Sequence, residues 1–239
     1  MTGLDFKAFK IAIASFAAVA VGGCSTQVTL KDPSIPDPLV DKLPLSVAAR
    51  YPERFEHFVH KEKVIGKKEW TIDMGRANSI LFNRLFDSMF TDFTVIKADA
   101  VAQDHEFDAL IEPSIDAFEF SVPNQSQTDA FAVWIRYRIK IFDADGNQLA
   151  NWPISAYGKS LDPGFAGDDE ALRRAAVLAM RDAAALIILQ MDKATGISAL
   201  SEARQRRLAR GAEAVEAEVS GARDDLQTTA SEDVPDDSG

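Results

Sequence analysis

The stretch Phe131–Phe142, with the sequence FAVWIRYRIKIF, alternates between apolar and polar side chains along most of its length. One set of alternate positions is apolar throughout: Phe131, Val133, Ile135, Tyr137, Ile139 and Ile141. Successive side chains of a β-strand point to opposite faces, so this set predicts a strand with one buried face. Asp145-Gly146 is a hairpin-turn signal, and we expect Gln148–Lys159 to return as the partner strand.

A second long strand is predicted upstream, over Phe107–Val122, and its alternation contains a break. The apolar positions change phase near Asp116-Ala117. A shift of one residue moves every later side chain to the other face, so the break predicts a β-bulge or a change of sheet face. Glu53–Lys63 is compatible with either a short helix or an extended segment. Shorter strands are predicted at Pro44–Tyr51, Glu69–Met74 and Phe93–Ile96.

Two helices complete the predicted fold. Asp169–Asp192 is apolar on most sides and begins with acidic residues, which favour the positive end of a helix. The order of strand, strand, helix, three or four antiparallel strands and helix predicts an α+β fold. In this fold two helices pack on one face of a mainly antiparallel sheet, as a single domain over residues 45–195. The other helix, Ala77–Phe90, carries a broad apolar stripe: Leu81, Phe82, Leu85, Phe86, Met89 and Phe90.

The N-terminus has the pattern of a lipoprotein signal peptide over residues 1–23. Lys7 and Lys10 precede Ile11–Val21, an uncharged apolar run of 11 residues. A bilayer-spanning helix needs about 20 residues, whereas a run of this length fits a secretory signal. The run ends in Val21-Gly22-Gly23-Cys24, which resembles the lipobox that directs cleavage before a lipid-modified cysteine. The alternatives are a buried thiol behind an ordinary secretory signal, or an uncleaved anchor helix.

The residues around Cys24 indicate where the mature chain is held. Ser25 follows it, and the absence of Asp at this position favours the outer membrane, with the domain facing the periplasm. Cys24 is the only cysteine, so the chain has no internal disulfide and its core must stabilise it. Residues 24–44 are predicted to form an extended tether because they contain four prolines: Pro33, Pro36, Pro38 and Pro44.

The overall charge is acidic, with a formal net charge of −11. Nucleic-acid binding rewards clustered Lys and Arg, so the composition argues against a nucleic-acid partner. Residues 201–239 hold ten acidic and five basic side chains. We therefore interpret residues 196–239 as a charged helical or disordered acidic tail.

Catalytic and metal-binding patterns are weak. His57 and His60 are spaced so that a helix would present both on one side, but no third ligand is evident. Asp143–Asn147 has the first residues of a calcium loop but lacks its full ligand set and closing glutamate, and a hairpin turn explains the motif with nothing added. The sequence contains no nucleophile elbow, phosphate-binding loop or dinucleotide fingerprint. We predict no catalytic residue, metal or cofactor, and a chain that is not an enzyme.

The outer face of the predicted strand Phe131–Phe142 is the candidate binding surface. Its cationic residues Arg136, Arg138 and Lys140 lie on the same face as Trp134. Two interpretations are open. The strip is either a solvated face paired with carboxylates of neighbouring strands, such as Glu112 and Asp116, or a docking surface for an acidic partner or an anionic lipid head group.

With its lipobox, its proline spacer and its order of strands and helices, the chain resembles small envelope lipoproteins built on one α+β module. The residues closest to a signature are Pro44–Val47, Glu69–Gly75 and Ile111–Ile115. Such lipoproteins include the auxiliary lipoproteins of ABC-type transport systems, the YajG-related lipoproteins and the lipoprotein of the lipopolysaccharide translocon. The resemblance covers about residues 24–192. It implies a non-catalytic accessory or adaptor role in envelope transport or assembly, with an envelope protein complex as partner.

Two other functions compete with this role. The first is a module that binds lipid or another small ligand in a cavity between the sheet and the helix Asp169–Asp192. The second is an envelope hydrolase, for which the sequence offers no motif. The membrane contact common to these hypotheses is the lipid on Cys24.

Overall fold

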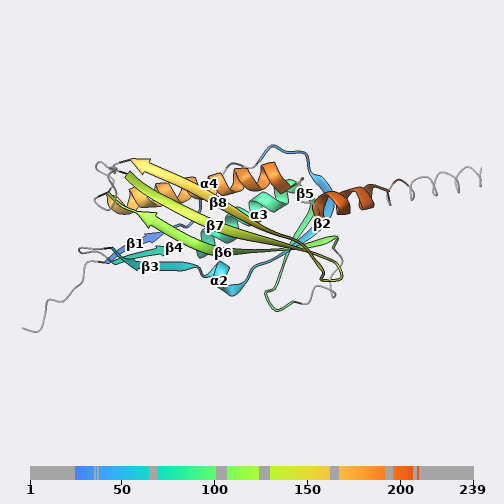
Figure 1. Cartoon of the computed structure of the whole chain (residues 1–239), viewed down its shortest axis with the longest axis horizontal. Helices are drawn as coiled ribbons and strands as arrows, with labels where there is room; N and C mark the ends of the chain where they lie inside the picture. The colour runs from blue at the N-terminus through green and yellow to red at the C-terminus, as the bar shows by residue number, and fades with distance from the viewer. Residues whose placement is uncertain are drawn as a thin grey trace, which may run out of the picture.

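Two β-sheets and a set of helices make up the described part of the chain (Figure 1). The structure is a computed structural model. It describes residues 25–34, 36, 38–64, 69–100, 107–123, 130–161, 167–191, 196–206 and 209. The signal peptide, Cys24 and the acidic residues after 209 lie outside these ranges.

The larger sheet has five strands in the order β5-β2-β6-β7-β8. β6, β7 and β8 are antiparallel neighbours, whereas β2 runs parallel to both β5 and β6. Most of the strand pairing is therefore antiparallel and lies among β6, β7 and β8, whereas the parallel strands β5 and β2 form one edge of the sheet. The strands are β2 (Leu43–Arg50), β5 (Phe90–Ile96), β6 (Ala109–Ser121), β7 (Ala130–Asp143) and β8 (Gln148–Leu161).

The smaller sheet has three strands in the order β1-β4-β3. β1 (Ser25–Thr29) pairs in parallel with β4 (Glu69–Asp73), and β3 (Val59–Lys63) is antiparallel to β4. The prolines of residues 24–44 predict an extended tether that includes residues 25–29. Residues 25–29 instead form a strand that begins at Ser25, and Val28 and Leu30 insert into the core. The sequence of this segment is short and mostly polar, so it does not by itself predict a strand. The segment is extended because its backbone pairs with β4.

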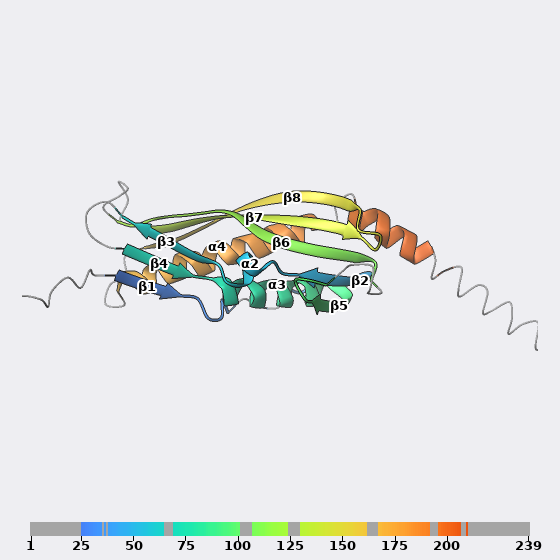
Figure 2. The same ribbon diagram turned by 90° about the horizontal axis from the view of Figure 1, so that it is seen from below.

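The helices lie on one side of the larger sheet, as Figures 1 and 2 show. α3 (Gly75–Met89) and α4 (Asp168–Met191) are the two long helices, and α2 (Glu53–Glu56) is a single turn. The ambiguous segment Glu53–Lys63 thus contains a helical turn followed by strand β3. The predicted α+β class is confirmed. None of the helices in the described ranges is long and apolar enough to cross a membrane.

The bulge predicted in β6 is confirmed. Pairing with β7 passes from Ile115 opposite Tyr137 directly to Ala117 opposite Arg136, so Asp116 is the extra residue. Beyond this point Phe118 and Phe120 turn into the core while Glu119 faces outward. The apolar alternation of β6 changes phase at Asp116. Because the bulge adds one residue there, the apolar side chains on both sides of it still point into the core.

The core is one continuous apolar cluster between the sheets and the helices. At its centre, the Phe82 ring lies edge-on to the rings of Phe55 and Tyr137, at centroid distances of 5.2 and 5.4 Å. Tyr137 is fully buried, and its hydroxyl donates a hydrogen bond of 2.8 Å to Oδ1 of the buried Asn78. This bond satisfies the hydroxyl and fixes the position of α3 against β7.

α4 lies directly on the backbone of β8. The side of α4 that meets the sheet carries small residues, including Ala175, Ala176 and Ala179, all fully buried. A Cβ on Gly158 of β8 would lie 2.0 Å from the carbonyl oxygen of Ala175. Helix and strand are therefore in backbone contact at Gly158, with no space between them for a ligand.

Residues 196–206 form a further helix that packs on the domain. Their composition predicts that they belong to the charged tail. Ile197 is fully buried in the core, and Arg204 forms an ion pair with Asp108. An apolar anchor and a charged contact thus hold this segment against the domain.

Candidate functional site

The candidate site lies on the face of β6, β7 and β8 that points away from α3 and α4. Alternation along β7 sends Trp134 and Arg136 to this face and Ile135, between them, into the core. The strand register then places residues of the neighbouring strands beside them. We call this surface the open face and define it by its central residues: Ala117, Glu119, Trp134, Arg136, Ser155 and Tyr157.

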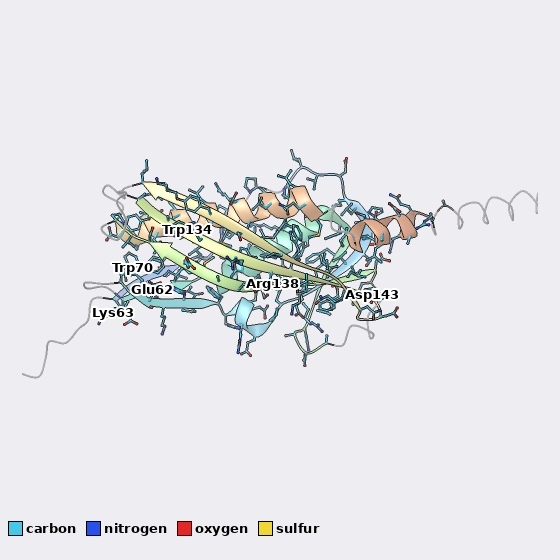
Figure 3. All side chains as sticks on the ribbon, in the orientation of Figure 1. Glu62, Lys63, Trp70, Trp134, Arg138 and Asp143 are labelled. Atoms are coloured by element: carbon cyan, nitrogen blue, oxygen red, sulfur yellow. The ribbon has the colours of Figure 1, made fainter. Side chains whose placement is uncertain are left out.

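Two aromatic side chains stand exposed at the centre of the open face. Trp134 and Tyr157 are opposite each other in the β7–β8 register, and their ring centroids lie 5.1 Å apart. Trp134 is 44% and Tyr157 is 43% exposed. Figure 3 shows Trp134 in the half of the molecule that also holds Trp70 and Lys63. A paired, half-exposed Trp and Tyr form a rigid apolar surface of the type that is enriched at protein interfaces.

A shallow groove of about 220 Å³ runs beside Trp134 and Arg136. Arg136 is opposite Ala117 on β6 and Ser155 on β8, so two small side chains flank the guanidinium. Within the described part of the chain, no carboxylate forms an ion pair with Arg136. Glu119, opposite Trp134, adds one negative charge at the rim. The groove thus combines an aromatic wall with an available cation.

The other cations of the predicted strip differ from Arg136. Arg138 donates from Nε to Asp116 Oδ2 at 2.7 Å and from Nη1 to Asn151 at 2.9 Å. The hydrogen bond to Asp116 raises the pKa of Arg138, because it stabilises the charged guanidinium. Arg138 therefore agrees with the first of the two interpretations, a solvated face paired with carboxylates of a neighbouring strand. Its partner is Asp116, the extra residue of the bulge.

Lys140 lies at the far end of the strip, opposite Glu112 in the β6–β7 register. Glu112, however, accepts a hydrogen bond from Arg50 Nε at 2.9 Å, across the parallel β2–β6 pairing. The four residues of the predicted strip therefore fall into two groups. Trp134 and Arg136 line the groove, whereas Arg138 and Lys140 lie beside polar residues of the neighbouring strands. Sequence reasoning missed Tyr157 and Glu119, because only the strand register brings them to Trp134.

The weak metal patterns do not assemble into sites. His57 follows α2 and His60 lies in β3, so the helical spacing that would align them does not form. The Asp143 carboxylate accepts hydrogen bonds from the Asn147 side chain and from backbone amides of its own turn. The Asn147 side-chain bond contributes most to lowering the pKa of Asp143. No group of three potential metal ligands occurs among the residues that the structure describes.

A second cavity, of about 340 Å³, lies between the segment after β1 and the outer side of α4. Arg181 Nη2 donates to the Ser34 carbonyl at 2.7 Å, which holds the two walls together. Arg173 is paired with Glu170 at 2.6 Å. The lining is cationic and partly apolar: Asp32, Pro33, Ser34, Arg173, Arg174, Val177, Leu178 and Arg181.

Comparison with known proteins finds similarity among solved structures only. Protein XCC0632 of Xanthomonas campestris, of family DUF330, has a TM-score of 0.44 and 11% identity, covering 77% of this chain and 99% of its own. Uncharacterized lipoprotein B of Nitrosomonas europaea has a TM-score of 0.34 and 17% identity, covering 66% and 90%. Lipoprotein GNA1162 of Neisseria meningitidis has a TM-score of 0.29 and 11% identity, covering 52% and 91%. No protein-family model and no curated protein matches the chain.

Proposed function

We propose that this chain is a lipid-anchored lipoprotein of the bacterial envelope that acts as a non-catalytic adaptor. In this proposal the lipid on Cys24 holds it at the outer membrane, facing the periplasm, and the open face binds a partner protein. The observation that carries the adaptor role is the exposed Trp134–Tyr157 pair beside Arg136.

The chemistry of the open face specifies the kind of partner. An aromatic wall favours a partner with an exposed apolar side chain, and Arg136 favours a carboxylate next to it. Trp and Arg are the residue types that most often dominate binding energy at interfaces. We therefore expect the partner to present a segment in which Asp or Glu adjoins an apolar residue.

Membrane attachment is tested by a Cys24→Ser variant. Without the acylated thiol, the variant should move from the membrane fraction to the soluble fraction while the domain keeps its melting temperature. Mass spectrometry of the N-terminal peptide should find lipid on Cys24 of the wild type only. Retention of the variant in the membrane, or an unmodified wild-type Cys24, would overturn the lipoprotein assignment.

The partner is tested by site-specific photo-crosslinking in cells. A photoreactive residue at Ser155, in the groove, should trap one envelope protein that the same residue at Asp87, exposed on α3, does not trap. Trp134→Ala should weaken binding by about 2 kcal/mol or more, roughly 30-fold in Kd. Leu189→Ala, at an exposed leucine of α4, is the matched control and should leave binding unchanged.

Charge complementarity supplies a stricter test. Arg136→Glu should abolish the crosslink, whereas Lys97→Glu, at an exposed lysine away from the groove, should not. Exchanging the partner's acidic residue for Lys should then restore binding to the Arg136→Glu variant. The adaptor proposal fails if no envelope protein is trapped, or if neither Trp134→Ala nor Arg136→Glu changes the crosslink.

A second candidate function, binding of a small anionic ligand or lipid, is favoured by the cavity beside α4. Its guanidinium groups would take an anionic head group, and Val177 and Leu178 would contact an apolar part. The location differs from the cavity expected between sheet and helix, where Gly158 and the alanines of α4 are in contact. Native mass spectrometry of the protein extracted from membranes decides this candidate: a bound anionic lipid that Arg174→Glu removes would support it.

A further inference from the structure

Ser25 is the first residue that the structure describes. It is paired with Glu69 of β4 in the smaller sheet, and Glu69 is in turn paired with Lys63 of β3. The three residues thus form one row across the end of this sheet. Consecutive Cα atoms are about 3.8 Å apart, so the anchor of the proposed function joins the described chain at this end, next to Ser25.

The strand that follows Cys24 is firmly attached. Every residue of β1 is paired with β4, and the Leu30 amide donates to the Asp73 carbonyl at 2.9 Å directly after it. Val28 and Leu30 are each 2% exposed. Releasing β1 to act as a tether would break this pairing and expose two core side chains to water, so the strand stays attached.

This geometry gives the domain a direction. β1 runs along the long axis, away from the end that holds Ser25 (Figures 1 and 2). Figure 3 places Glu62 and Lys63 near that end and Asp143 near the opposite one. The 14 residues of β7 span about 46 Å, so the two ends would lie at clearly different distances from a bilayer if the long axis is directed away from it.

We propose that the end of the domain formed by Ser25, Lys63 and Glu69 rests on the bilayer that holds the lipid of Cys24, with the long axis directed away from it. The inference rests on the lipid anchor of the proposed function. The β7–β8 turn and the helix 196–206 then form the distal end. Trp134 lies four residues into β7, about 13 Å along the strand from its start, so the open face is offered to partners close to the same membrane.

The test uses the lipidated full chain in vesicles of phosphatidylethanolamine and phosphatidylglycerol that contain a head-group-attached nitroxide quencher. Because the only native cysteine carries the lipid, an introduced cysteine is the single labelling site. Lys63→Cys probes the near end, and Ala144→Cys, in the exposed turn after Asp143, probes the distal end. A fluorophore on Lys63→Cys should be strongly quenched, and one on Ala144→Cys should keep its vesicle-free intensity.

A variant with a longer linker tests whether the short connection between the lipid and β1 is what holds this end of the domain at the bilayer. A flexible Gly/Ser insertion of about 12 residues between Cys24 and Ser25 adds roughly 20 Å of reach. Quenching at Lys63→Cys should then fall towards the value at Ala144→Cys. Equal quenching at the two sites without the insertion, or an insertion that changes nothing, would overturn the orientation.

The same samples distinguish the two proposals. If mass spectrometry finds no lipid on Cys24, the lipoprotein assignment itself has failed. If the lipid is present and the two labels are quenched equally, the anchor stands and only the orientation is refuted. The melting temperatures of both cysteine variants should match that of the wild type, because both positions are exposed.

Discussion

Replacing Gly158 by alanine tests how closely α4 lies on β8. The added Cβ would lie 2.0 Å from the Ala175 carbonyl oxygen and 2.3 Å from the Ala179 amide nitrogen. Real Cβ contacts below 3.0 Å essentially never occur, so α4 or β8 must move by about 1 Å at this point. Both contacts are backbone atoms, and no side-chain rotation can relieve them.

The expected magnitude follows from two opposing effects. Overpacking of a closed interface costs about 1–3 kcal/mol. Glycine within a strand is itself unfavourable relative to alanine by roughly 0.5–1 kcal/mol, because it loses more backbone entropy on folding. Because both contacts are with backbone atoms, the cost lies at the upper end of this range. After the glycine effect is subtracted, Gly158→Ala should lower the free energy of unfolding by about 2 kcal/mol, or the melting temperature by about 4–8 °C. Without the contact, the same substitution would stabilise the protein.

Urea unfolding followed by circular dichroism and tryptophan fluorescence measures this difference. Lys159→Ala, the exposed neighbour, is the matched control and should change stability by less than about 0.5 kcal/mol. Ala179→Gly should not rescue Gly158→Ala, because the clash involves the Ala179 amide rather than its side chain. A Gly158→Ala protein as stable as the wild type would refute the backbone contact. It would also restore the ligand cavity between sheet and helix as a candidate.

Three further predictions concern the core, the acid response and the C-terminal helix. Tyr137→Phe should lower the free energy of unfolding by about 1–3 kcal/mol, because Asn78 Oδ1 loses its donor in the core; adding Asn78→Leu should recover part of this loss in a urea double-mutant cycle. The folded-state pKa of Asp143 lies below its ordinary 3.8, mainly through the Asn147 hydrogen bond, so its stabilisation is present above pH 3.8 and is lost as the pH falls through the folded-state value. Asp143→Ala should therefore flatten the acid limb of stability measured by urea unfolding at a series of pH values, and an unchanged limb would contradict the assignment. Ile197→Ala should cost about 2–5 kcal/mol and increase hydrogen exchange over residues 196–206, whereas unchanged exchange would show that this helix is not held by the core.

Local features of the fold were predictable because they depend on neighbours in the sequence. The alternation of β7, the turn after Asp143, the bulge at Asp116 and the apolar stripe of α3 are all visible as periodicity or turn chemistry. The candidate site was half predictable for the same reason. Alternation shows that Trp134 and Arg136 share an outward face, but it does not show which residues stand beside them.

Pairing between distant strands was not predictable from the same patterns. The parallel position of β2 between β5 and β6 depends on hydrogen bonds to segments far away in the chain. β1 is a short polar strand whose pairing is supplied entirely by β4. A segment with little local preference takes its structure from its partner, and the tether expected over residues 24–44 therefore begins with a strand.

The sequence alone determined the α+β class, the outward face of β7 and the lipobox pattern at Cys24, since each is a matter of local period or local motif. Only the tertiary structure decided that Arg138 is paired whereas Arg136 has no ion pair among the described residues, because the bulged Asp116 reaches the guanidinium of Arg138. It also decided that Tyr157 joins Trp134 and that β1 starts directly after Cys24. Strand register and close packing are set by the whole fold, and periodicity records only which side of each element is buried.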